Sequence, residues 1–238
     1  EFLAWFALIP FFYSLRDQDP LSCLFRGTLT GLLFFLGVLY WVVVAVHTYG
    51  KISLVLSILI LLLLIVYLSL FWGAFAMIFR LVEQRMGSRG LILTPVFWVA
   101  LEHLRSFLLT GFPWANLGHS QYLNLPFIQV AEITGVYGLS FTVLLVNVTL
   151  YLVLRQWPDQ RFPYREALIA ALILIGTLVY GYVRIDFVEK QTQRQQALSV
   201  GLAQGNIDQA VKWNEAFQKE TLERYERLSL RLAEGKPD

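Results

Sequence analysis

Long runs of apolar residues, separated by short polar stretches, fill the first three quarters of the chain. A helix that crosses a membrane needs about 20 mostly apolar residues, because a hydrocarbon layer about 30 Å thick is crossed at about 1.5 Å per residue. The runs predict six spans, of which the first is short and the fourth carries Glu102, His103 and Arg105. The predicted spans are 2–15, 27–46, 52–79, 91–109, 126–154 and 166–184.

The pattern changes after Arg184. Residues 186–196 are polar and predict a linker or a protruding arm. The short apolar run Ala197–Ala203 is typical of a buried strand, although seven residues also fit a helix. From 214 to 233 apolar residues recur at helical spacing, which predicts an amphipathic helix. One strand and one helix cannot bury a core, so we expect 197–238 to be the truncated start of a larger α/β domain.

Composition and charge support this division. Hydrophobic residues make up 57% of the chain and charged residues only 15%, and the mean hydropathy is +0.57. Soluble domains carry about 25% charged residues, so a water-soluble globule and a disordered chain are both excluded. Residues 1–183 hold 18 charged side chains, and the 55 residues from 184 to 238 hold another 18. The predicted fold class is a polytopic α-helical membrane bundle over 1–185, followed by a water-exposed segment.

The distribution of Arg and Lys predicts the orientation of the bundle. Cytoplasmic loops of membrane proteins are enriched in these residues. The first, third and fifth loops hold eight of them, whereas the second and fourth hold two, Lys51 and Arg105. We therefore expect the second and fourth loops and the C-terminal segment on the outer side. The eight are Arg16, Arg26, Arg80, Arg85, Arg89, Arg155, Arg161 and Arg165.

The loop Gly111–Gln121, with the sequence G-F-P-W-A-N-L-G-H-S-Q, is the most unusual stretch. In a structural interpretation Pro and Gly end the fourth span and Trp114 anchors it at the interface. In a functional interpretation the loop lines a cleft that lipid enters from the outer leaflet. We expect His119 to be a hydrogen-bonded loop residue rather than a catalytic base.

Ionisable residues within predicted spans need partners, because charge is costly in hydrocarbon. Glu102 and Arg105, three residues apart, are expected to pair with each other, or Arg105 to extend to the headgroups. For Glu132, exposure at the interface and a buried partner remain equally open. Asn147 is expected to hydrogen-bond between helices.

The remaining chemistry is sparse. Cys23, the single cysteine, excludes an internal disulfide and a multi-cysteine metal site, and it is expected to be an inert small hydrophobe. We expect no metal and no cofactor. The chain has no Arg/Lys cluster, so nucleic acid is not an expected partner.

Several separated motifs resemble one family, the bacterial apolipoprotein N-acyltransferases. They are G-F-P-W-A-N-L-G-H-S-Q at 111–121, Q-V-A-E at 129–132, G-V-Y-G-L-S-F at 135–141 and V-G-L-A-Q-G-N-I-D-Q-A-V-K-W at 200–213. Their order and spacing cover essentially the whole chain. The resemblance implies a multi-pass bacterial inner-membrane enzyme with a periplasmic nitrilase-like (carbon–nitrogen hydrolase) domain, of which 197–238 would be the N-terminal part.

The resemblance also implies the reaction. Such an enzyme moves an acyl chain from a phospholipid, through a cysteine thioester, to the N-terminal lipid-modified cysteine of an apolipoprotein, the last step of lipoprotein maturation. The partners implied are a phospholipid acyl donor, a diacylated apolipoprotein acceptor and membrane lipid. The family's catalytic Glu, Lys and Cys would follow Asp238, so we expect these 238 residues to be a fragment that is inert alone. The resemblance assigns substrate binding to Trp213, Trp114, Phe112, Pro113, Gln121 and Glu132.

Two alternatives compete with this interpretation. A membrane transporter or channel with a soluble regulatory tail would explain the spans, but its usual paired repeats and midplane charges are not visible. A membrane anchor for a soluble domain would explain the topology but not the loop at 111–121. Trp213 itself could bind substrate or simply pack into a larger domain.

Overall fold

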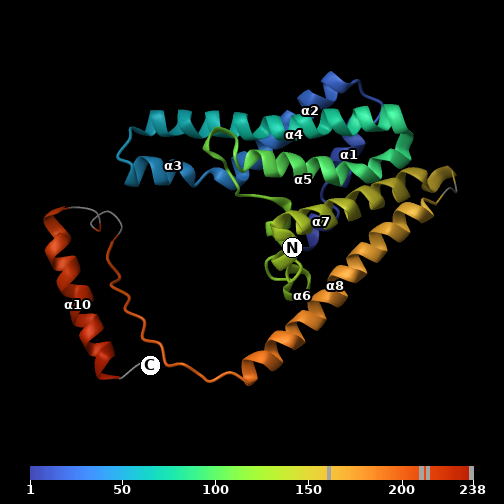
Figure 1. Cartoon of the computed structure of the whole chain (residues 1–238). Helices are drawn as coiled ribbons and strands as arrows, with labels where there is room; N and C mark the ends of the chain where they lie inside the picture. The colour runs from blue at the N-terminus through green and yellow to red at the C-terminus, as the bar shows by residue number, and fades with distance from the viewer. Residues whose placement is uncertain (160–161, 209–211, 213–214, 236–238) are drawn as a thin grey trace.

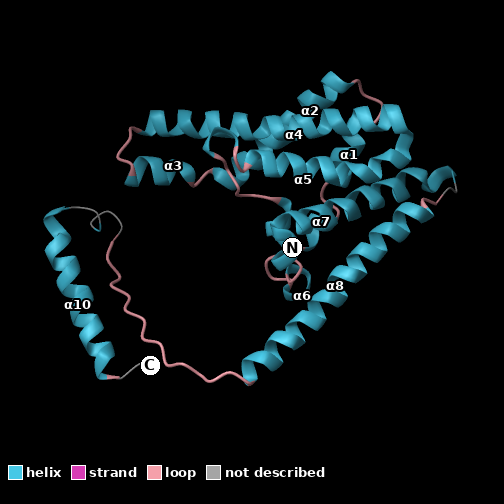
Figure 2. Ribbon diagram, in the orientation of Figure 1, coloured by secondary structure: helices cyan, strands magenta, loops and turns pink. Residues whose placement is uncertain are grey.

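The computed structural model describes residues 1–159, 162–208, 212 and 215–235, which form helices and loops without a strand (Figure 2). Four helical segments are long and apolar enough to cross a membrane. This confirms a helical membrane bundle. The four segments are Pro20–Leu39, Leu54–Arg105, Ala131–Gln156 and Tyr164–Gln193, and a shorter apolar stretch covers Phe2–Leu15.

Helices α2 (Pro20–Leu39) and α4 (Leu54–Gly90) pack along each other, joined through α3 (Val42–Val44) and a π-helical turn (Figure 1). Small residues line their contact: a Cβ on Gly27 would lie 2.6 Å from the Cβ of Ala76, and one on Gly31 would lie 2.9 Å from the Cα of Ser69. Small residues let helix backbones approach closely in a membrane, where water does not drive association.

The predicted spans 52–79 and 91–109 form one 52-residue helical segment that folds back on itself. Gly87 has φ 70° and ψ −177°, a conformation that strains other residues, and the chain reverses there. Helix α5 (Thr94–Arg105) then returns beside α4 (Figure 1). Trp98 meets the rings of Trp72 and Phe75 edge to face, with centroids 5.0 and 4.8 Å away.

The first predicted span is a broken helix. It consists of a 3₁₀ turn (Phe2–Trp5) and α1 (Ile9–Leu15). Asn147 of α7 (Ala131–Gln156) satisfies the break: Leu8 N–H donates to its Oδ1 over 3.1 Å, and its Nδ2 donates to the Ala4 carbonyl over 2.7 Å. Non-helical backbone is tolerated at membrane depth where protein groups satisfy it. The expected interhelical role of Asn147 is thus confirmed.

The last two predicted spans differ from the observed helices at their ends. Span 126–154 divides into α6 (Leu125–Ile128) and α7, which kinks at Gly135 (φ 62°). Helix α8 (Tyr164–Gln193) replaces the span 166–184. It continues through most of the polar stretch predicted as a linker or arm, because no helix breaker intervenes and Lys190 pairs with Asp186 one turn away at 2.6 Å.

The segment after α8 differs from the prediction. Residues 197–203 are extended but form no strand, and Leu198, Val200 and Leu202 are exposed. A strand needs a neighbour to pair its backbone groups, and the described residues supply none. The amphipathic helix is confirmed as α10 (Gln218–Glu234). Its Leu232 lies against Gly201, and its Tyr225 lies against Gly205.

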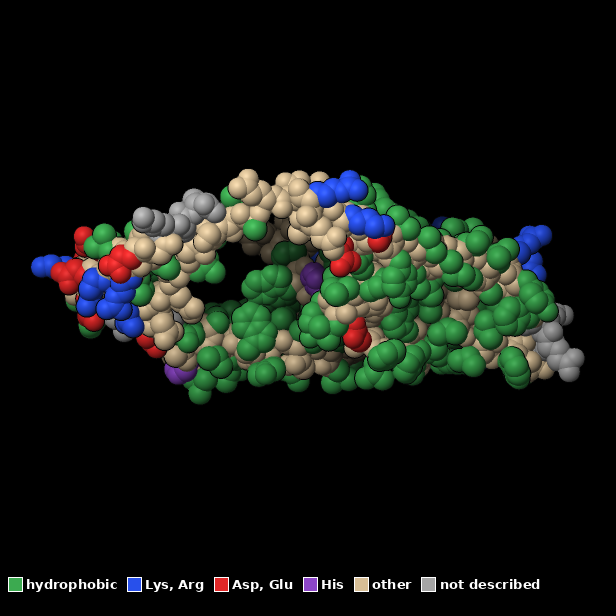
Figure 3. All heavy atoms as spheres, turned by 90° about the horizontal axis from the view of Figure 1, so that it is seen from below, with side chains coloured by type: hydrophobic (Ala, Val, Ile, Leu, Met, Phe, Trp, Pro, Cys, Tyr) green, Lys and Arg blue, Asp and Glu red, His purple; other side chains and the backbone are tan. Residues whose placement is uncertain are grey.

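The surface of the bundle differs from that of the C-terminal segment. Seen from below, hydrophobic side chains cover the bundle and charged side chains gather over α10 (Figure 3). The extended segment carries the chain from α8 to α10, which lies apart from the bundle (Figure 1). Inside the bundle Cys23 is fully buried and donates to the Leu15 carbonyl over 3.5 Å, as expected of a small hydrophobe.

Candidate acyl-chain cavity

The loop Gly111–Gln121 is held against the bundle by a buried arginine. Arg105, at the end of α5, is 3% exposed. Its Nη2 donates to the Trp114 carbonyl oxygen over 3.0 Å and to Oδ1 of Asn116. Its own carbonyl accepts from Phe112 N–H over 2.8 Å. One guanidinium therefore fixes the path of the loop where it leaves the helix.

Glu102, one turn earlier, binds the same loop. Its Oε1 accepts from the Trp98 indole N–H over 2.9 Å and from Leu117 N–H over 2.8 Å. Glu102 and Arg105 therefore do not pair with each other, and Arg105 does not extend outward, contrary to both expectations. Each side chain holds the loop instead, because the loop offers backbone groups that would otherwise be buried without partners.

The loop also packs against α7. Gly118 N–H donates to Ser140 Oγ over 2.8 Å, and a Cβ on Gly118 would lie 2.6 Å from the Val136 carbonyl oxygen. Earlier in the chain the backbone adopts left-handed φ angles, 51° at Leu109 just before the loop and 57° at Ala115 within it. Such conformations cost free energy in residues other than glycine and often occur at functional sites.

A cavity of about 660 Å³ lies between this loop, the broken N-terminal helix and α2. Binding sites for small molecules commonly have about 300–1,000 Å³. The walls are mostly apolar, and Trp72 and Trp98 contribute from α4 and α5, while Asn116, His119 and Ser120 are the polar residues at the loop. The lining comprises Ala4, Ala7, Leu8, Phe11, Thr30, Leu33, Phe34, Val38, Trp72, Trp98, Ala115, Asn116, Leu117, His119 and Ser120.

The predicted site residues of the loop flank this cavity rather than line it. Trp114 is 54% exposed, and its ring lies near those of Phe112 and Trp41, with centroids 5.5 and 5.6 Å away. Phe112 is half-buried against the core, and Pro113 is exposed. The carbonyl oxygen of Trp114, not its ring, meets Arg105.

The other predicted site residues lie elsewhere. Gln121 is buried and its Nε2 donates to the Glu1 carbonyl over 3.0 Å. Glu132 is half-exposed and bridges α7 to α8, accepting from Arg184 at 2.8 Å and from the hydroxyl of Tyr180. Glu132 thus has a partner, but not a buried one. Trp213 lies outside the described residues.

His119 has the role expected for it. Its Nδ1 accepts from the backbone N–H of Asn116 over 3.3 Å. Desolvation of the ring and the positive charge of Arg105 lower the pKa of His119 below its ordinary value. The imidazole is therefore neutral at pH 7, with its proton on Nε2.

Sequence reasoning missed most of the cavity lining. Asn116 and Ser120 lie within the motif but carried no signal apart from being polar in an apolar context. Ala4 and Ala7 are small residues on a short, broken helix, a combination that leaves room beside it. Their spacing gives no indication of the break, which depends on Asn147 far along the chain.

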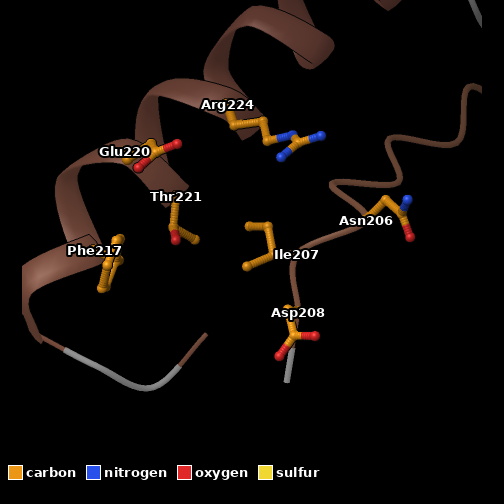
Figure 4. Close-up of a pocket in the computed structure, with 7 residues that line it drawn as sticks. All are labelled: Asn206, Ile207, Asp208, Phe217, Glu220, Thr221 and Arg224. Atoms are coloured by element: carbon orange, nitrogen blue, oxygen red, sulfur yellow. The ribbon is translucent and has the colours of Figure 1, made fainter. Parts of the chain in front are cut away.

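A second cavity, of about 180 Å³, lies between the extended segment and α10 (Figure 4). Ile207 points toward Thr221 across it. The charged residues Asp208, Glu220 and Arg224 also line it, which does not suit an acyl chain. Within the described residues, no three His, Cys, Asp or Glu side chains lie together as metal ligands would.

Comparison with known proteins agrees with the resemblance. Residues 1–149 match the family model described as the apolipoprotein N-acyltransferase N-terminal domain. Proteins named apolipoprotein N-acyltransferase are similar over most of the chain. The Geobacter metallireducens protein is 41% identical over 238 residues, 99% of this chain and 45% of its own length. Those of Pasteurella multocida and Coxiella burnetii are 34% and 32% identical, covering 94% and 87% of this chain and 42% and 41% of theirs.

The chain spans less than half the length of these relatives. The family model, however, covers well over half of the chain. It includes the loop at 111–121, the broken N-terminal helix and α2. The chain therefore belongs to the apolipoprotein N-acyltransferase family.

Proposed function

We propose that the chain forms the membrane part of an apolipoprotein N-acyltransferase and that the 660 Å³ cavity holds an acyl chain of the donor phospholipid. The observation that carries this proposal is the apolar cavity beneath the loop that Arg105 and Glu102 hold in place. An acyl chain fits apolar walls because burying each methylene contributes about 0.8 kcal/mol. Family membership supports the reaction class.

The number of membrane crossings and the orientation of the bundle are part of the same proposal. We infer six crossings in a bacterial inner membrane, with the loop at 111–121 and the segment 197–238 on the periplasmic side. The Arg-rich loops support this orientation. Residues 197–238 would begin a nitrilase-like domain, whose further strands would pair with the exposed extended segment.

A cavity-filling variant tests the proposal in the full-length protein. Ala7→Trp would occupy the cavity, and the control Ala171→Trp would place the same ring on the exposed face of α8. Transfer of labelled acyl chains from phospholipid to a diacylated peptide should fall about 5-fold to 150-fold in Ala7→Trp only, if the bound chain meets an overpacking cost of about 1–3 kcal/mol. Equal activity of the two variants would contradict the proposal.

Trp213 is tested separately. We propose that it contributes to substrate binding, since it occupies the position of a tryptophan that the resemblance assigns to the acyl-substrate cleft. In the full-length protein Trp213→Ala should impair acyl transfer far more than it lowers the amount of folded protein. Equal losses of both would instead assign Trp213 to packing.

A further inference from the structure

The side-chain amide of Asn116 has its oxygen and nitrogen in different situations. Its Oδ1 accepts from Nη2 of Arg105, and the side chain also accepts from the backbone N–H of His119. Arginine has only donors, so the amide oxygen must face it. The orientation of the amide is therefore fixed, and Nδ2 with its two N–H groups is turned away from Arg105.

Asn116 is only 4% exposed, and its Nδ2 is buried without a partner among the described residues. Leaving a buried donor unpaired is unfavourable, so buried amides almost always find an acceptor. Asn116 lines the apolar cavity, whose other walls are mostly hydrocarbon. The unpaired donor thus belongs to the polar end of a site with apolar walls.

Neighbouring unpaired atoms do not offer the same chemistry. Oε2 of Glu102 and Oε1 of Gln121 are also buried without a partner, but both are acceptors. Nε of Arg105 is a donor, yet Arg105 lines a different cavity of about 10 Å³, between Trp98 and Phe75, which has room for one water molecule at most. Among the buried unpaired side-chain atoms of the described residues, only Nδ2 of Asn116 is a donor on a residue that lines a cavity large enough for a lipid chain.

We propose that Nδ2 of Asn116 donates a hydrogen bond to the ester carbonyl oxygen of the acyl chain in this cavity. The inference rests on the proposed function, because it adds a polar anchor to the same site. The anchor would fix how deep the chain lies, with its carbonyl at the loop and its methylenes between α1, α2 and the two tryptophans. Arg105 would be the positioning residue that keeps the amide turned toward the carbonyl.

Lipids that differ only in this carbonyl test the proposal. Trp72 and Trp98 line the cavity, so a phospholipid with a brominated acyl chain should quench their fluorescence on binding. It can be displaced by phosphatidylethanolamine with ester-linked chains or by its ether-linked analogue, which has no carbonyl. The wild-type chain in detergent should bind the ester lipid about twofold to tenfold more tightly, the range that one hydrogen bond supplies.

Asn116→Asp keeps the size of the side chain and both acceptor functions but removes the N–H donors. We expect it to bind both lipids with equal affinity. The matched control is Asn124→Asp: Asn124 caps α6 by accepting from Phe127 N–H over 3.4 Å, a role that aspartate also performs, and it lies outside the cavity. This control should keep the preference for the ester lipid.

The outcomes separate the inference from the proposed function. If neither lipid displaces the brominated probe, the cavity does not bind acyl chains and the proposed function fails. If both displace it equally from the wild-type chain, the function stands and the hydrogen bond is wrong, whether or not the variants fold. A diacylglyceryl-cysteinyl peptide carries the same ester, so its competition with the phospholipid identifies which lipid supplies the carbonyl.

Discussion

Two polar clusters, each with a buried glutamate, differ in how completely their atoms are paired. The Glu83 cluster comprises Arg80, Glu83 and Arg155: Glu83 accepts from Arg80 at 2.6 Å and from Arg155. The Asn116 cluster comprises Glu102, Arg105 and Asn116. Phe71 of α4 lines the small cavity beside Glu102 and Arg105. Glu83 lies twelve residues further along the same helix, so the two clusters lie roughly 18 Å apart along α4.

In the Glu83 cluster both carboxylate oxygens are used, and Arg80 also donates to the Gln18 carbonyl over 2.6 Å. In the Asn116 cluster every member has a buried atom without a partner among the described residues. A fully paired cluster holds the fold together, whereas unpaired buried donors and acceptors indicate a ligand or water. The comparison assigns structure to the first cluster and binding to the second.

Removing the charge of Glu83 should have the largest effect. Glu83→Gln leaves the partly buried Arg80 and Arg155 without their counter-charge. Breaking a fully buried ion pair destabilises a protein by about 3–5 kcal/mol, and we expect a loss up to that size. Thermal unfolding in detergent measures the loss. Glu226→Gln on the exposed face of α10 is the control and should unfold as the wild type does.

Asn147→Leu should have the next largest effect on stability. Asn147 resembles Asn116 in burial, but both its oxygen and its nitrogen are paired, to Leu8, Ala4 and Val143. The variant leaves two backbone groups at the helix break unpaired, each worth about 1–3 kcal/mol. The free energy of unfolding should fall more than in Asn116→Asp. A smaller fall than in that variant would contradict the assignment of Asn147 to structure.

Arg105→Lys tests the positioning of the amide. Lysine keeps the charge but not the planar fork of the guanidinium. We expect the preference for ester-linked over ether-linked lipid to disappear, while the affinity for the ether lipid stays within about twofold, because the apolar walls are unchanged. Lipid displacement measures both. An unchanged preference would show that Asn116 needs no positioning by Arg105.

Glu102→Gln should have a small effect on stability, in contrast to Glu83→Gln. Glutamine keeps an oxygen for Trp98 and Leu117 and places its amide nitrogen where Oε2 has no partner. We expect a change within about 1 kcal/mol, measured by the same unfolding experiment. Equal losses from the two substitutions would remove the difference between the clusters.

The smallest expected effect is a pH dependence at His119. Because the pKa of His119 is lowered in the folded protein, the folded state binds fewer protons than the unfolded state below the ordinary pKa. The contribution of His119 to stability is thus complete above about pH 6.5 and is lost as the pH falls through the folded-state value. Between pH 7.5 and pH 5 the free energy of unfolding should fall less steeply with decreasing pH in His119→Gln than in the wild type.

The sequence predicted the parts of the fold that depend on local composition. Apolar runs located the helices of the bundle, and helical spacing located α10. The failures have identifiable causes. The reversal at Gly87 depends on one positive φ angle, the break before α1 depends on Asn147, and the run 197–203 lacks a neighbouring strand among the described residues.

The candidate site was predicted less completely. The motif at 111–121 identified the loop, but its aromatic residues flank the cavity. The lining comes from residues 115–120 together with residues 4–11, α2, Trp72 and Trp98. Arg105 and Glu102 were expected to pair with each other. Their partners in the loop become visible only when α5 and the loop are packed together, since hydrogen bonds between distant groups leave no periodic signal.

The most direct test of the central claim is to map where a lipid chain binds. A phospholipid with a photoactivatable group along its acyl chain can be cross-linked to the chain in membranes, and the modified residues identified by mass spectrometry. The account predicts dominant cross-links to residues 4–11, the second half of α2 and residues 115–120, all reduced by Ala7→Trp. Cross-links spread over the exposed apolar face of α8, with none in these segments, would contradict it.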